Sequence, residues 1–184
     1  MKRCIVASVI AAFSCCFAVG VLATESPYAG QEARSIKALS PEDTEAYLSG
    51  KGMGLAKAAE LNGYAGPAHV LELAAQLSLT VEQRARTQEL FASMQAKAAG
   101  LGRALVERER ELDQLFASKT ITHDRLASAL SEIASLQAQI RGAHLEAHLA
   151  QVELLTPQQN ALYAQLRGYT GADQNRGHSG RHKH

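Results

Sequence analysis

The chain contains no tryptophan, and aromatic residues make up only 5% of its 184 residues. Its three cysteines all lie within the first 16 residues. An apolar run at 5–22 follows a basic Met-Lys-Arg start and ends in small residues. These features predict a secretory signal peptide, residues 1–23, which is cleaved after Ala23 and directs the protein to the periplasm. The mature protein would then have neither a disulfide nor a reactive thiolate.

A cleaved signal fits this segment better than two alternatives. The 18-residue run could just span a bilayer as an anchor, but Ser14 and Gly20 dilute it and no basic cluster follows. A lipoprotein anchor would use Cys15 or Cys16. Phe13 makes the preceding residues a poor lipobox.

An excess of charge of one sign is also lacking. The chain has 19 basic and 18 acidic side chains, and removal of Lys2 and Arg3 with the signal lowers 19 to 17, a net charge of −1. This balance gives no reason to expect nucleic acid as a partner. The chain has no Gly-x-Ser-x-Gly elbow, phosphate-binding loop or His-Glu-x-x-His motif, so we do not expect an enzyme.

What the chain does have is a repeated Leu-Thr-x-x-Gln segment. In each copy the threonine hydroxyl can accept a hydrogen bond from the glutamine backbone, while the glutamine side chain reaches back to the threonine N–H. Each copy therefore predicts a helix that begins just after its threonine, and the pair suggests an internal repeat. The two copies, 76 positions apart, are Leu79, Thr80 and Gln83, and then Leu155, Thr156 and Gln159.

Between these motifs apolar residues recur at spacings of three, four and seven, which predicts helices and almost no strand. One long helix is expected from Val81 to about Phe116. A second is expected from a cap at Thr122 to the second Leu-Thr hinge. Short helices at 67–76 and 157–167 flank the pair, so that 66–168 form one helical domain.

The two ends of the mature chain are less regular. Residues 24–65 form a glycine-punctuated arm with short helices, and its Gly-Lys-Gly-Met-Gly segment at 50–54 is predicted to be a flexible linker. The place of this arm relative to the other helices does not follow from the sequence. The tail at 169–184 lacks apolar periodicity and is predicted to be disordered.

The predicted fold is all-α: an elongated antiparallel helical hairpin with short flanking helices. Such a hairpin is one layer deep, whereas stable domains usually need two layers around a core. A second copy of the chain or an unfolded client would have to cover the remaining apolar face. The candidates for this client or dimer surface are Leu90, Met94, Leu101, Leu105, Leu126, Leu130 and Ile133.

An exported signal, the absence of mature cysteine and the boxes LTVEQ and LTPQQ together resemble the LTxxQ superfamily of bacterial periplasmic stress proteins. That group includes the Spy and CpxP proteins and zinc-resistance-associated and heavy-metal-sensor relatives. The resemblance implies a cradle-shaped homodimer. Members of this superfamily bind unfolding proteins without ATP, inhibit an envelope-stress sensor of the membrane, or bind transition metals. The near-neutral charge departs from the basic client surface of Spy-like members.

The preferred functional hypothesis is therefore an ATP-independent, chaperone-like envelope stress protein that binds unfolded periplasmic proteins and requires no cofactor. The alternative is a protein that binds or senses Zn²⁺, Ni²⁺ or Co²⁺. His144 and His148 lie one helical turn apart and can chelate such an ion. If the two hinges lie side by side, His69 and Glu72 fall level with this pair. The tail adds His178, His182 and His184.

A simpler interpretation of each candidate ligand stays open. Histidines on an inner helical face are often hydrogen-bonded to a neighbour or a water. Glu72 can be a solvated helix residue, and the histidines of the tail can belong to a merely polar segment.

Overall fold

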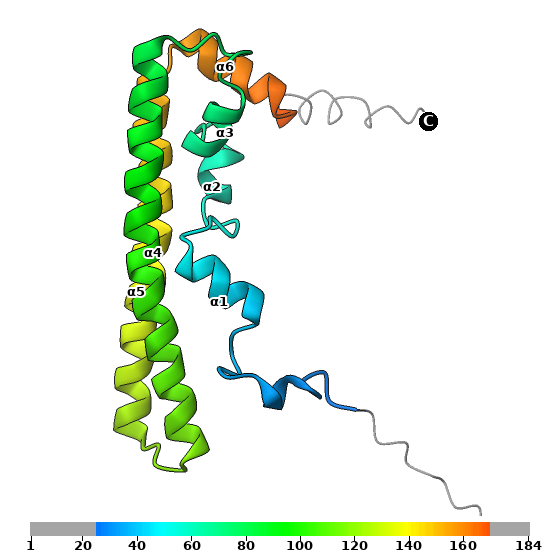
Figure 1. Ribbon diagram of the computed structural model, residues 1–184, viewed down its shortest axis with the longest axis vertical. Coiled ribbons are helices and arrows are strands. Elements are labelled where there is room, and N and C mark those ends of the chain that lie inside the picture. Colours follow the sequence, from blue (N-terminus) through cyan, green and yellow to red (C-terminus); the bar gives the residue numbers. More distant parts are fainter. Residues whose placement is uncertain (1–24, 170–184) are drawn as a thin grey trace, which may run out of the picture. The chain divides into compact units, whose positions relative to one another are not determined.

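The computed structural model describes residues 25–169, and every regular element among them is helical (Figure 1). The all-α prediction is confirmed for this part of the chain. The predicted signal peptide and the tail histidines lie outside the described residues. The elements are the 3₁₀ helix η1 (Gln31–Ala33) and the α-helices α1 (Pro41–Leu48), α2 (Lys57–Glu60), α3 (Pro67–Glu72), α4 (Val81–Ala117), α5 (His123–Leu154) and α6 (Pro157–Leu166).

The chain divides into two units. The first ends at Glu32, and its described residues form turns and the beginning of η1. The second begins at Ala33 and contains all six α-helices, so the arm from Ala33 onward and the long helices belong to one unit. No helix within residues 25–169 is long and apolar enough to cross a membrane.

The two long helices, α4 and α5, pack against each other along their lengths (Figure 1). Lys97 pairs with Glu146 at 2.9 Å, and farther along α4 Arg108 pairs with Glu132 at 3.1 Å. As the residue number on α4 rises from 97 to 108, that of its partner on α5 falls from 146 to 132, so the two helices run in opposite directions. The core between them is a buried cluster of Leu105, Ile133 and Ile140.

The N-terminal arm supplies a further layer against this pair. Helix α1 packs on α4, and Tyr47 and Leu55 contact the buried cluster around Leu105. The approach is close because α4 has a glycine at the crossing point. A Cβ on Gly102 would overlap the carbonyl oxygen of Tyr47 and lie 2.7 Å from its carbon. A glycine inside a helix normally costs up to about 1 kcal/mol, and here it makes room for another backbone.

The arm also corrects two members of the predicted client or dimer surface. Leu105 is 0% exposed and Ile133 only 5% exposed, so both belong to the core of one chain. Leu101 packs against the same core and is half-buried. The sequence does not fix the position of the arm on the long helices, and this face is therefore predicted to be uncovered.

Each Leu-Thr-x-x-Gln segment forms a capping box at a helix start. The Thr80 hydroxyl accepts from the Gln83 N–H, and the Gln83 side chain accepts from the Thr80 N–H, both at 3.1 Å. Thr156 and Gln159 repeat the pattern at 3.2 and 2.9 Å. Helix α4 therefore begins after Thr80 and α6 after Thr156, as expected.

The two motif glutamines also bind each other. Gln83 Nε2 donates to Gln159 Oε1 at 2.8 Å, and Gln159 Nε2 donates to Gln83 Oε1 at 3.0 Å. Each Nε2 also donates to a backbone carbonyl of the opposite hinge, that of Leu154 at 2.9 Å or Leu77 at 3.1 Å. Both amides thus make all four hydrogen bonds available to them. A carboxylate has no N–H group and cannot replace either amide.

A second apolar cluster surrounds the paired hinges and joins α3 to α6. Leu77, Leu155 and Tyr163 are buried there with Ala65 and Val70, and Leu79 packs at its edge. Helix α3 ends at Glu72, four residues before the predicted end at position 76. The chain then turns, with Ser78 at a positive φ of 50°, so that Leu77 enters this cluster.

Replacement of Gly102 by alanine should weaken the packing of α1 on α4, because the new Cβ would overlap the Tyr47 carbonyl group. We expect the free energy of unfolding to fall by about 1–3 kcal/mol in urea denaturation followed by circular dichroism. The control is Gly100→Ala in the same helix, whose Cβ would meet only the Arg103 guanidinium at 3.8 Å. The free energy of unfolding of this control variant should rise by about 0.5–1 kcal/mol, because alanine favours the helix interior over glycine. Equal effects of the two changes would contradict the packing of α1 at Gly102.

The substitution Gln83→Glu keeps the capping box but removes both donors to the opposite hinge. We expect a loss of about 2–4 kcal/mol in the free energy of unfolding, since Leu154 O and Gln159 Oε1 would face a charged acceptor. Gln88→Glu, at an exposed position of α4, introduces the same charge and should change stability by less than about 0.5 kcal/mol. Similar losses in both variants would show that charge, and not the amide pair, is responsible.

Candidate functional site

A pocket of about 570 Å³ lies where the arm meets the two long helices. Its walls come from the 50–54 segment, α2, the start of α3, the middle of α4, the end of α5 and the residues after α6. Most of the lining is apolar. Its charged and imidazole side chains are Lys51, Lys57, Glu60, His69, His144, His148 and Arg167.

Three of the four metal ligands predicted within the helices therefore line one pocket. His69 comes from α3, and His144 and His148 come from α5. The fourth, Glu72, is not part of the lining. Its carboxylate accepts a hydrogen bond from His69 Nδ1 at 2.9 Å on an exposed surface. Glu72 thus orients His69 from outside the pocket and leaves Nε2 of the neutral His69 ring with a lone pair.

His148 is held in a defined tautomer. Its Nδ1 lies 2.8 Å from the carbonyl oxygen of Tyr64, which can only accept, so Nδ1 carries the proton. The neutral ring then has its lone pair on Nε2. Gly66 makes room for this ring, since a Cβ there would lie 2.9 Å from Nε2 and 2.7 Å from Cε1. An imidazole whose Nδ1–H donates to a carbonyl is the usual arrangement of a histidine metal ligand.

His144 is almost fully buried, with 4% of its surface exposed. Burial lowers its pKa, and the neighbouring His148 lowers it further. The ring is therefore neutral at neutral pH. Its Nε2 is buried without any hydrogen-bond partner. An unpaired polar atom in this position costs stability unless a ligand or a water binds it.

Glu60, at the end of α2, is the central acidic group of the pocket. Its Oε1 accepts hydrogen bonds from the hydroxyl groups of Tyr163 at 2.6 Å and Tyr169 at 2.9 Å and from Arg167 Nε at 3.3 Å. Burial and the bond to Glu60 raise the pKa of Tyr163 strongly. Oε2 is buried without a partner, and His148 Nδ1 lies 3.7 Å away, too far for a hydrogen bond.

Sequence reasoning missed Glu60. It lies in a helix of four residues, too short for apolar periodicity to place it beside α5. It is also far in sequence from its partners, because 103 residues separate it from Tyr163. The 50–54 segment differs from expectation as well. It forms defined turns, with positive φ values at Gly50, Met53 and Gly54, and lines the pocket.

Donor chemistry in the pocket fits a transition-metal ion. Imidazole nitrogens and a carboxylate oxygen are the usual ligands of zinc and its neighbours, and both unpartnered atoms, Glu60 Oε2 and His144 Nε2, are of these types. Within residues 25–169, however, no three histidine, cysteine, aspartate or glutamate side chains are already arranged around one point. Binding through these groups therefore requires side-chain rotation.

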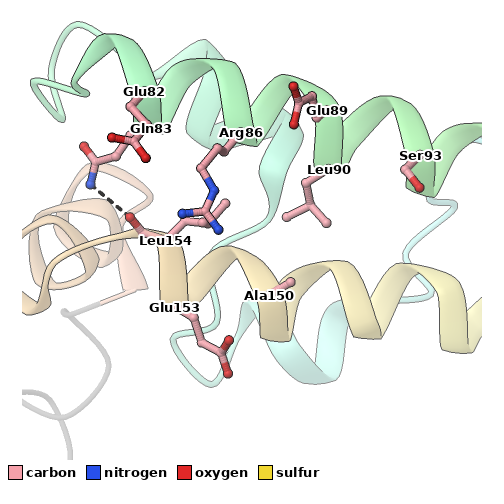
Figure 2. Close-up of a pocket in the computed structure, with 9 residues that line it drawn as sticks. All are labelled: Glu82, Gln83, Arg86, Glu89, Leu90, Ser93, Ala150, Glu153 and Leu154. Atoms are coloured by element: carbon pink, nitrogen blue, oxygen red, sulfur yellow. Dashed lines mark hydrogen bonds between the residues drawn. The ribbon is translucent and has the colours of Figure 1, made fainter.

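A second pocket, an open groove of about 720 Å³, lies between the start of α4 and the end of α5 (Figure 2). The hydrogen bond from Gln83 to Leu154 lies at one end of it (Figure 2). Leu90, a predicted client contact, projects into the groove among charged side chains such as Arg86 and Glu89. None of the side chains that line it has an unpartnered buried polar atom.

The remaining predicted contact residues differ in exposure. Met94 lines the first pocket and is half-buried. Leu126 is half-buried, whereas Leu130 is 49% exposed. These positions on α5 lie near the turn that joins the two long helices, away from the arm-covered core.

No family model matches the chain, and neither a curated protein nor a solved structure matches it. The likeness to LTxxQ proteins therefore depends on the two boxes themselves.

Proposed function

We propose that this protein is exported to the periplasm and binds a transition-metal ion, such as Zn²⁺, Ni²⁺ or Co²⁺, in the pocket between arm and long helices. The main support is the pair of buried atoms without partners, Glu60 Oε2 and His144 Nε2. Both belong to the pocket that His148 also lines. A cation compensates buried acceptors directly, whereas an apolar ligand would leave them unpaired.

The surrounding contacts support this assignment. Tyr64 and Glu72 accept from the Nδ1 atoms of His148 and His69, which leaves each Nε2 as a donor atom for a metal. Glu60 is held by two tyrosine hydroxyls and a guanidinium on its other oxygen. Glu60, His144 and His148 would hold the ion, and His69 could complete the set. His178, His182 and His184 of the tail would act as auxiliary collectors.

The proposed assembly is that of an LTxxQ stress protein. The α4–α5 pair would be the elongated hairpin of a cradle-shaped homodimer, and an envelope-stress sensor in the membrane is its proposed regulatory partner. The two capping boxes and the antiparallel pairing of α4 with α5 support this assembly. No catalytic step is proposed.

Calorimetric titration with Zn²⁺ and Ni²⁺ tests the metal proposal on the mature chain and on the chain truncated after Gly171. We expect the truncated chain to keep its affinity for the metal ion. In the double variant His144→Gln/His148→Gln this affinity should fall at least tenfold, because both imidazole donors are lost. His123→Gln is the matched control, since His123 is exposed at the start of α5 and outside the pocket. Its affinity should stay within twofold of the parent.

Two outcomes would count against this proposal. One is the absence of any heat of binding in the truncated chain with the pocket intact. The other is equal binding by the double variant and the parent, provided that circular dichroism shows both to be folded.

The second candidate function is chaperone-like binding of unfolded periplasmic proteins, and one observation favours it. Large apolar side chains stay exposed near the turn between the long helices, where Phe116 is 55% and Leu130 is 49% exposed. Leu61 at the pocket is also mainly exposed. Such side chains can contact apolar segments of a client.

Light scattering of a denatured client, with the protein at substoichiometric to equimolar amounts, tests this function. We expect suppressed aggregation that decreases at least twofold in Phe116→Ser/Leu130→Ser, because the exposed apolar surface is removed. Val81→Ser, at another exposed apolar position, is the control and should keep the activity. Unchanged aggregation with the parent protein would rule out the chaperone function for that client.

A further inference from the structure

Both methionines of the described chain lie in one place. The sequence has three methionines, of which Met1 belongs to the predicted signal peptide. Met53 and Met94 line the same pocket as His69, His144 and His148. Neither apolar core cluster includes a methionine. Thioether and imidazole donors are thus concentrated at one site.

Met53 has a backbone conformation that its residue type does not favour. Its φ is +46°, in the left-handed region that costs a side-chain-bearing residue about 1 kcal/mol or more. Glycine, which adopts this conformation without strain, occupies both neighbouring positions, 52 and 54, but not position 53. Met53 is 42% exposed, so burial does not explain the choice either. Ser78 and Lys119 also have positive φ values, but of these three residues only Met53 lines the pocket.

The 50–54 segment, which contains Met53, lies close both to α4 beside Met94 and to His144. A Cβ on Gly52, next to Met53, would lie 4.0 Å from Nδ1 and Cε1 of His144. On the other side of the segment, a Cβ on Gly50 would lie 2.5 Å from the carbonyl oxygen of Gln95, which follows Met94. The 50–54 segment therefore spans from the α4 turn that carries Met94 to the imidazole of His144.

The charge of the pocket favours a cation of low charge. Glu60 is its carboxylate, and Arg167 pairs with it at 3.3 Å. Lys51 and Lys57 also line the pocket. Repulsion from these cationic groups scales with the charge of the bound ion, so a divalent ion can bind beside Glu60 but a singly charged ion is opposed less. Soft thioether donors select cuprous copper among the biological metals.

We infer that the pocket binds Cu(I) through the thioethers of Met53 and Met94 together with the imidazoles of His144 and His148. This inference rests on the proposed function, which makes the pocket a metal site, and names the ion that the site prefers. The side chains of Met53 and Met94 have several rotatable bonds, which lets both sulfur atoms turn toward the histidines.

The test is an anaerobic competition titration of the mature chain with Cu(I) against bicinchoninate, in parallel with a Zn²⁺ titration. Met53→Leu/Met94→Leu keeps the apolar volume and removes only the sulfur donors. We expect its Cu(I) affinity to fall at least tenfold while its Zn²⁺ affinity changes less than twofold. X-ray absorption of the Cu(I)-loaded parent should show a sulfur shell that the double variant lacks. Leu61→Ala, at the same pocket, is the control and should keep both affinities.

The outcomes separate this inference from the proposed function. Unchanged Cu(I) affinity in the double methionine variant, or a Cu(I) site without sulfur, overturns the inference and leaves the pocket as a Zn²⁺ or Ni²⁺ site. An equal loss of Cu(I) and Zn²⁺ affinity also overturns it, because the methionines would then act by packing. If the parent binds neither ion, the proposed function and the inference fail together.

Discussion

The reciprocal amide pair of Gln83 and Gln159 is the interaction on which the rest of the structure depends. It links the start of α4 to the start of α6 and satisfies backbone carbonyls of both hinges. Because α6 is fixed there, Tyr163 and Arg167 reach Glu60 from the far end of the chain. The acidic group of the pocket is thus positioned by a repeat whose sequence signature is only a pair of helix caps.

The arm is the second element that shapes the pocket. It covers the Leu105 core, so fewer apolar residues are free for a client than a bare pair of helices would offer. It also closes one side of the pocket with the 50–54 segment and α2. The same packing therefore leaves less apolar surface for an unfolded client and encloses a small pocket with defined donor groups. Gly102 makes this possible by admitting the backbone of Tyr47.

Much of the candidate site could be predicted because helical periodicity is local. His144 and His148 were expected to face inward together, and both line the pocket. His69 was placed beside them by the spacing of the two repeats. Glu72 lies outside the pocket lining and contacts His69, because equal spacing from a hinge does not fix the direction of a side chain at the end of a six-residue helix. Glu60 was missed, because its contacts join segments about 100 residues apart.

The sequence by itself determined where α4 and α6 begin, since a threonine cap and a glutamine three residues later act within one turn of chain. It also determined the all-helical class, because apolar spacing follows the helical period. Only the tertiary structure decided which apolar residues are hidden, which carboxylate meets the histidines and how the two hinges bind each other. These outcomes depend on contacts between distant segments, and such contacts are selected by packing and hydrogen bonding in three dimensions.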